Sequence, residues 1–161
     1  HLDDKASAAV LLGVSKYVSE AGIVPEYTTN LLISTYEEVG HGAAYIPSGT
    51  VEFVSVDMGA PGQGQNSSEY AVCICAKDSA GPYDLDLRKK FVSLCRDNGI
   101  DYRTDIYPNY ASDASAAQRA GWDIKAGLIG PGVFASHAYE RTHKDSLLNT
   151  AKLVIEYMKS R

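Results

Sequence analysis

Apolar, strand-like runs that end in acidic residues constrain the fold of this 161-residue chain more than any other feature. Residues 27–35 end just before the adjacent pair Glu37 and Glu38, and residues 51–56 run directly into Asp57. Burying an ionised carboxylate is costly unless it is paired or binds a metal. Acids that recur at strand ends therefore indicate either solvated loops, which is the common case, or one shared polar site.

Helical patterns alternate with these runs. Expected helices cover residues 5–21, the segment between Asp84 and Gly99, residues 114–120 and residues 147–158; expected strands cover residues 27–35, 51–56, 70–76, 102–107 and 124–129. This alternation predicts an α/β fold with a mostly parallel sheet and helices on both faces. The chain has no internal repeat and no second compositional block, so we expect residues 1–161 to form a single domain.

Composition excludes some classes of partner. Hydrophobic residues make up 45% of the chain and charged residues 22%, and the net charge is −5. An acidic chain lacks the basic stripe that neutralises phosphates, so we expect no nucleic-acid partner. No apolar run approaches the length of a membrane span and no signal peptide is visible, so we expect a cytoplasmic protein. The cysteines Cys73, Cys75 and Cys95 are interpreted as buried apolar groups in a reducing compartment.

Polar residues that follow the strand-like runs are the candidates for a site. In parallel sheets, ligands bind beyond the carboxyl ends of the strands. The residues in question are Glu37, Glu38, Asp57, Asp78 and His137. Such acids repel one another unless a cation lies among them, and oxygen and imidazole ligands suit Zn²⁺, Co²⁺ or Mn²⁺. A two-metal centre also needs a bridging carboxylate and a free carboxylate that accepts a proton from water.

Simpler interpretations exist for several of these residues. Asp3 and Asp4 could only cap the first helix, and Asp57 could be an acid of a strand-end turn. Asp78 is interpreted as a turn residue. His41 follows the Glu pair and is a rival ligand, although we favour a supporting or solvent-exposed role for it.

The polar loop after the last strand carries further candidates. His137 and His143 lie six positions apart in it, and an isolated surface histidine usually binds nothing. In the same loop, Tyr139, Glu140 and Arg141 could close a local ion pair of little energetic value.

Five short motifs together resemble the glutamyl or deblocking aminopeptidases, the TET-type family of dinuclear metallopeptidases. In chain order they are Asp3-Asp4-Lys5-Ala6, Glu37-Glu38-Val39-Gly40, Val56-Asp57, Ser112-Asp113-Ala114 and Ser136-His137. Each motif alone is weak, but their order and spacing make the set fairly specific. The resemblance covers essentially the whole chain.

This resemblance implies a set of metal ligands. Asp3 is implied to be the ligand that bridges two metals, with a cis peptide bond between Asp3 and Asp4. Glu38 and His137 are implied to share one metal, and Asp57 to bind the other. The implied cofactors are two divalent ions per site, zinc or cobalt.

The resemblance also implies an activity. Glu37 corresponds to the general base, and Asp113 belongs to a loop on the substrate side, with Ser112 in place of the family's Thr. The implied enzyme is a metalloaminopeptidase that hydrolyses the N-terminal residue of peptides through a water activated by two metals. Its partners are then peptide substrates, and the full-length protein is expected to be a homo-oligomer.

One departure limits this expectation. The family's further metal-binding histidine and its inserted β-rich domain lie upstream of the Asp-Asp motif, and neither occurs in this chain. His1 is too close to Asp3 to replace that histidine easily. We therefore expect the C-terminal part of a larger catalytic domain, which binds at most one metal tightly and has little activity alone. A non-catalytic domain of the same fold, or a related exopeptidase or deacylase, remain as alternatives.

Overall fold

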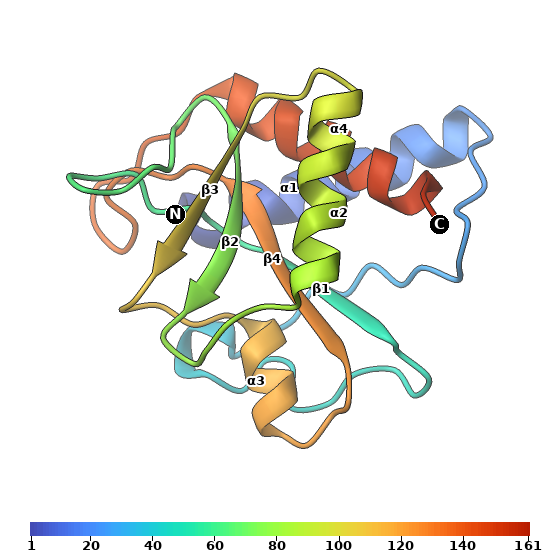
Figure 1. Cartoon of the computed structure of the whole chain (residues 1–161), viewed down its shortest axis with the longest axis horizontal. Coiled ribbons are helices and arrows are strands. Elements are labelled where there is room, and N and C mark those ends of the chain that lie inside the picture. Colours follow the sequence, from blue (N-terminus) through green and yellow to red (C-terminus); the bar gives the residue numbers. More distant parts are fainter.

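A computed structural model describes all 161 residues, from His1 to Arg161. Its centre is a four-stranded sheet with the strand order β1-β4-β2-β3 (Figure 1). The strands are β1 (Glu52–Val56), β2 (Val72–Asp78), β3 (Tyr102–Tyr107) and β4 (Lys125–Pro131). The helices are α1 (Leu2–Glu20), the 3-10 helix η1 (Glu37–Val39), α2 (Leu85–Asp97), α3 (Asp113–Arg119) and α4 (Lys144–Lys159).

The sheet is mixed, and mostly parallel as predicted. β1 and β4 are parallel, with Val56 opposite Ile129, and β2 and β3 are parallel, with Ile74 opposite Thr104. The two pairs meet in an antiparallel contact, where Ile74 also lies opposite Ile129. The carboxyl ends of β1 and β4 therefore lie at one end of the sheet, and those of β2 and β3 at the other. The carboxyl ends of the four strands therefore do not form one continuous edge, as they would in a fully parallel sheet.

The predicted strand over residues 27–35 is wrong. These residues run from the end of α1 toward η1 without joining the sheet (light blue in Figure 1). Their apolar side chains Leu31, Leu32 and Ile33 are exposed. A β-strand needs a neighbour to accept and donate its backbone hydrogen bonds. No strand of this chain offers one, so the β-branched composition alone does not produce a strand.

Helices cover both faces of the sheet, as predicted. Helices α1, α2 and α4 share the larger core, in which Val14, Phe91 and Leu153 pack against Ile74 and Ile129. Helix α3 stands apart from them on the opposite face (Figure 1). Two smaller clusters form there. Ala114 of α3 packs against strand residues in one, and Ala117 packs against residues 43–46 in the other.

The helix boundaries differ little from the prediction. Helix α1 has non-helical dihedral angles at Asp3 and Asp4, so its regular part begins near Lys5. Helix α4 begins at Lys144, where the His143 side chain accepts a hydrogen bond from the Asp145 amide. The three cysteines are buried and unpaired, as predicted. Among these helices, none combines the length and the apolar character needed to cross a membrane.

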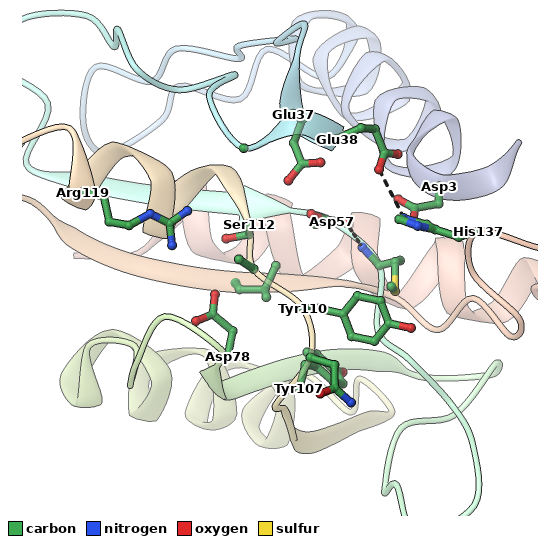
Figure 2. Close-up of a pocket in the computed structure, with 15 residues that line it drawn as sticks. Asp3, Glu37, Glu38, Asp57, Asp78, Tyr107, Tyr110, Ser112, Arg119 and His137 are labelled. Carbon is green, nitrogen blue, oxygen red and sulfur yellow. Dashed lines mark hydrogen bonds and ion pairs between the residues drawn. The ribbon is translucent and has the colours of Figure 1, made fainter.

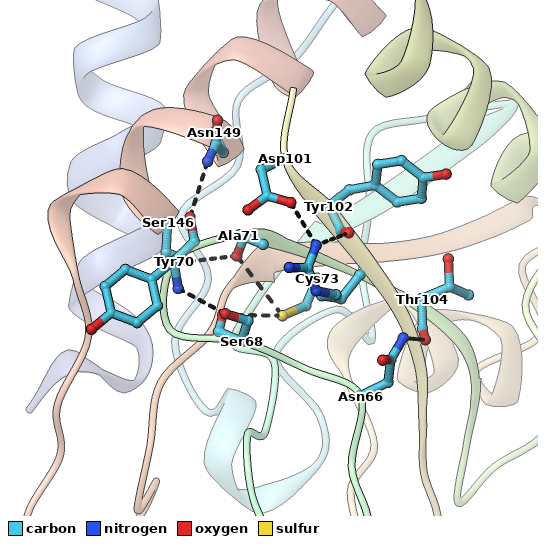
Figure 3. Close-up of polar contacts among 11 residues, drawn as sticks. Asn66, Ser68, Tyr70, Ala71, Cys73, Asp101, Tyr102, Thr104, Ser146 and Asn149 are labelled. Atoms are coloured by element: carbon cyan, nitrogen blue, oxygen red, sulfur yellow. Dashed lines mark hydrogen bonds and ion pairs between the residues drawn. The ribbon is translucent and has the colours of Figure 1, made fainter. Parts of the chain in front are cut away.

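Polar contacts fasten the loop between β1 and β2 to its surroundings (Figure 3). The Asn66 side chain donates to the Thr104 carbonyl on β3, at 2.9 Å. At the far end of the loop, the Ser146 hydroxyl on α4 donates to the Ala71 carbonyl, at 2.6 Å. The Asn149 amide donates to the Tyr70 carbonyl, at 3.0 Å. The long glycine-rich connection is thereby tied to both β3 and α4.

Candidate metal centre and active site

Acidic side chains from several separate elements line one pocket (Figure 2). Asp3 comes from the start of α1, Glu37 and Glu38 from η1, and Asp57 from the residue after β1. His137 enters from the loop between β4 and α4. The structure therefore brings together residues that are up to 134 positions apart in the sequence.

The first ligand group consists of Asp3, Glu38 and His137. The Nε2 atom of His137 lies 3.2 Å from Oδ2 of Asp3 and 3.2 Å from Oε2 of Glu38. Zinc bonds of about 2.0–2.1 Å in a tetrahedron separate neighbouring ligand atoms by about 3.3–3.4 Å. The Glu38 and His137 side chains are 57% and 59% exposed, whereas Asp3 is 8% exposed. The three side chains fit an open divalent-metal site with a position free toward solvent.

The second ligand group consists of Asp3, Asp4 and Asp57. One carboxylate oxygen of each lies within 4.8 Å of the others. Burial, with Asp3 and Glu37 nearby, raises the pKa of Asp4 to about 8. Burial, with Asp4 and Glu37 nearby, also raises the pKa of Asp57 well above its usual range. The charged forms of Asp4 and Asp57 are therefore disfavoured in this crowded group unless a cation offsets the repulsion.

Asp3 belongs to both groups, which is the arrangement a bridging ligand requires. The Asp3–Asp4 peptide bond is cis, as the family resemblance implied. Asp4 does act as a helix cap, because its Oδ1 accepts the Ser7 amide at 3.3 Å. The Asp3 carboxylate instead accepts a hydrogen bond from the Ser136 hydroxyl, at 2.6 Å. The capping interpretation therefore holds for Asp4 and not for Asp3.

Glu37 lies next to both groups without being a member of either. Its 3-10 turn is bounded by two left-handed residues, Tyr36 with φ 63° and Gly40 with φ 81°. Desolvation raises the pKa of Glu37 to about 7, and the carboxylates of Asp113 and Glu38 add to this rise. A carboxyl group that titrates near neutrality beside a candidate metal site has the property needed in a general base.

Asp113 packs against the segment that carries Glu37. Its Oδ2 accepts the Ser34 hydroxyl at 2.5 Å, and the side chain is almost fully buried. A Cβ atom at Gly42 would lie 2.7 Å from Oδ1 of Asp113 and 3.0 Å from the Glu37 nitrogen, so only glycine fits there. The pocket is lined at this point by Ser112. A contact between Asp113 and substrate stays a prediction.

With this geometry established, the comparisons identify the family. Residues 1–153 match the family described as M42 glutamyl aminopeptidase. The chain belongs to this family. It is 55% identical over 161 residues to YhfE, a Bacillus subtilis (strain 168) protein named as an aminopeptidase, covering 99% of this chain and 46% of YhfE.

Solved structures with the same fold are TET-type peptidases. A TET aminopeptidase from the marine sediment archaeon Thaumarchaeota archaeon SCGC AB-539-E09 superimposes with a TM-score of 0.83 at 18% identity, over 98% of this chain and 47% of that one. The Pyrococcus horikoshii TET1 peptidase gives 0.81 at 21% identity, over 98% and 48%. This M42 chain thus spans about half the length of the relatives it matches.

Asp78 lies apart from both ligand groups of this M42 chain (Figure 2). It ends β2, which runs opposite to β1 and β4, and it lines the same pocket without belonging to either ligand group. Its carboxylate is buried and accepts hydrogen bonds from Tyr83 at 2.5 Å and Ser115 at 2.8 Å. It also accepts the Ala80 amide at 2.7 Å, in agreement with the turn interpretation.

The remaining histidines do not join the ligand groups. His41 is exposed and stacks on Tyr36 with ring centroids 5.1 Å apart, in agreement with a solvent-exposed role. His143 caps α4. His137 is thus the one imidazole of the site, and the group around Asp57 has none.

A role for Glu140 was not anticipated from the sequence. The predicted local ion pair between Glu140 and Arg141 is wrong, because Arg141 pairs with Glu69 at 2.6 Å instead. The Glu140 carboxylate accepts the backbone amides of Leu2 and Asp3. No local pattern could have revealed a contact that spans 137 positions.

Proposed function

We propose that this chain carries the metal-binding and proton-transfer residues of an aminopeptidase. The observation that carries the proposal is the convergence of Asp3, Glu38 and His137 on one point, with the Glu37 carboxyl beside them. Membership of the M42 family and the similarity to YhfE support the same activity. The reaction is hydrolysis of the peptide bond after an N-terminal residue.

The two ligand groups would hold two divalent ions, zinc or cobalt. Asp3, Glu38 and His137 would bind one of them, and Asp57 would bind the other together with the shared Asp3. Asp4, which the geometry adds to this second group, would complete an all-oxygen set. When bound, such ions act as Lewis acids toward a carbonyl oxygen and toward water.

The side chains of the pocket supply the remaining chemistry. Glu37 would take a proton from the attacking water and return it to the leaving amine, which a carboxyl group with a pKa near 7 can do in both directions. The acidic lining also favours a cationic group on the substrate. The α-ammonium of a peptide provides this group, and its presence distinguishes a free N-terminus from the interior of a chain.

The whole protein is proposed to extend beyond these residues. Residues 1–161 would form the C-terminal part of a larger catalytic domain, because they correspond to about half of the relatives' length. The P. horikoshii TET1 peptidase is described as assembling into a tetrahedron or an octahedral shell, which supports a homo-oligomer here. Three buried, unpaired cysteines support a reducing compartment such as the cytoplasm.

Metal titration and peptide assays test the proposal together. The 161-residue chain should bind one Zn²⁺ or Co²⁺ tightly by calorimetry and show little turnover, since only the first group contains an imidazole. A full-length protein, meaning a polypeptide of the relatives' length containing these residues, should bind two and release N-terminal residues from free peptides. No tight metal in either protein would favour the non-catalytic alternative. Preferential hydrolysis of N-blocked substrates would favour a deacylase or another exopeptidase.

A further inference from the structure

We propose that Glu140 is a positioning residue, a single buried carboxylate that fixes Asp3 and His137 relative to each other before any metal binds. The inference rests on the proposed function only in assigning metal binding to Asp3 and His137. The hydrogen bonds of Glu140 to the Leu2, Asp3 and His137 amides involve no metal. The positioning role and the metal site can therefore be tested separately.

The hairpin that carries His137 contains residues in an unfavourable backbone conformation. Its base is closed by two backbone hydrogen bonds between Phe134 and Arg141, at 2.8 and 3.1 Å. At its tip, Ala135 has φ 54° and His137 has φ 66°. Residues other than glycine rarely adopt this left-handed conformation, which costs of order 1–3 kcal/mol each. Contacts beyond the two hydrogen bonds at the base must offset that cost.

Glu140 supplies such contacts in two directions. Its Oε2 accepts the amides of Leu2 and Asp3, the latter at 3.3 Å. Its Oε1 accepts the amide of His137, also at 3.3 Å. The side chain is 6% exposed, and its bonds to the Leu2 and Asp3 amides are partly shielded from water. One carboxylate thus joins the backbones of two residues that belong to the same ligand group.

Ser136 adds a side-chain link between the same two segments. Its hydroxyl donates to Oδ2 of Asp3 at 2.6 Å. This is the oxygen that lies 3.2 Å from Nε2 of His137. Glu140 therefore holds the two backbones, and Ser136 orients the Asp3 carboxylate toward the imidazole. Removal of groups that orient metal ligands typically costs about 10–100-fold in metal affinity.

An acidic residue that contacts the hairpin from the loop between β1 and β2 provides a matched control. Glu69 accepts two hydrogen bonds from the Arg141 guanidinium, at 2.6 and 2.9 Å. Arg141 follows Glu140 directly, but this pair is more exposed and touches neither Asp3 nor His137. Glu69→Gln weakens an ion pair of the same hairpin and leaves the link through Glu140 intact.

The experiment compares Glu140→Gln, Glu140→Ala and Glu69→Gln in the 161-residue chain. Backbone NMR of the metal-free proteins reports the amide resonances of Asp3 and His137. Calorimetric titration with Co²⁺ reports metal affinity, and thermal unfolding confirms that each variant is folded. Glutamine keeps the size of Glu140 and can still accept with its one carbonyl oxygen. It is therefore expected to fold even where alanine does not.

We expect both amide resonances to shift in both Glu140 variants, and the Co²⁺ dissociation constant to rise about 10-fold or more. The Glu69→Gln variant should stay within about 2-fold of the unsubstituted chain. Unchanged Asp3 and His137 amides in both Glu140 variants would overturn the proposal. So would an equal loss of Co²⁺ affinity in Glu69→Gln. If the unsubstituted chain binds no Co²⁺ while the amides still respond to Glu140, the positioning role stands and the proposed metal site fails.

Discussion

The two ligand groups share Asp3 and differ in chemistry and in exposure. The group with Glu38 and His137 is open to solvent, contains an imidazole, and is already spaced as a zinc site requires. The group with Asp4 and Asp57 is less exposed and contains only carboxylates, and burial with nearby acids raises the pKa values of Asp4 and Asp57. The first group can form without an ion. In the second, the ionised carboxylates of Asp4 and Asp57 would repel one another in a poorly solvated place. We expect the two to respond differently to substitution, to pH and to metal.

The largest effect should come from removing the shared residue. Asp3→Ala in the full-length protein should abolish turnover and lower the content of both metals, because this carboxylate belongs to both groups. Asp57→Ala should lower mainly one metal. Metal analysis of the two purified variants measures this inequality. Equal and small losses would mean that Asp3 bridges nothing.

Glu37→Gln should separate proton transfer from metal binding. The substitution keeps the size of the side chain, and Glu37 belongs to neither ligand group. Both metals should therefore remain while kcat falls by about 10²–10⁴-fold, the usual contribution of a general base. Steady-state assays measure the fall in kcat, and metal analysis of the same preparation measures whether both metals remain. A near-normal kcat would remove Glu37 from the mechanism.

Gly130→Ala should disturb the carboxylate group alone. A Cβ atom at Gly130 would overlap the carbonyl of Asp57, so the end of β1 must move. Overpacking of this kind costs about 1–3 kcal/mol, which corresponds to roughly 2–12 °C in Tm for a chain of this size. Gly62→Ala is the matched control, because a Cβ there meets nothing within 4 Å. Co²⁺ affinity of the imidazole-containing group should be the same in both variants.

The smallest effect concerns pH. The pKa of Asp4 is about 8 in the folded chain against an ordinary value of 3.8, so the folded metal-free state binds more protons than the unfolded state between these values. Stability should therefore fall as pH rises from about 4 to about 8. We expect Tm in EDTA to drop by about 3 °C or more between pH 5 and pH 8, and the drop to shrink in Asp4→Asn or with added Zn²⁺. A Tm that rises over this window would contradict the raised pKa.

Much of this site was predictable from motifs, and less of it from strand geometry. The residues Asp3, Glu37, Glu38, Asp57 and His137 line one pocket, although the sheet is mixed and has no continuous rim of strand ends. β2 runs antiparallel to β4, and Asp78 at its end lines the pocket without joining either ligand group. The direction of a strand depends on which neighbour it pairs with, and periodicity within the strand carries no information about that neighbour.

Long-range polar contacts were the least predictable feature. Glu140 reaches Asp3, and Asp113 reaches Ser34, across more than seventy positions each. Glu140 looks like an ordinary surface acid in sequence, and the motif that contains Asp113 gives no sign of its contact with Ser34. Only the closure of the fold brings the amide or hydroxyl donors within their reach.

The unpaired segment over residues 27–35 also has a consequence for the behaviour of the chain in solution. Residues 28–34 combine β-branched and aliphatic side chains with no charge and no proline, the composition of segments that form intermolecular cross-β stacks. Pro25 and the pair Glu37–Glu38 flank this stretch and act as gatekeepers against such stacking. Because the segment is exposed and unpaired, we expect concentrated solutions of the isolated chain to form thioflavin-positive aggregates beginning there, despite these flanking residues. Leu32→Lys should delay their onset and leave both ligand groups intact.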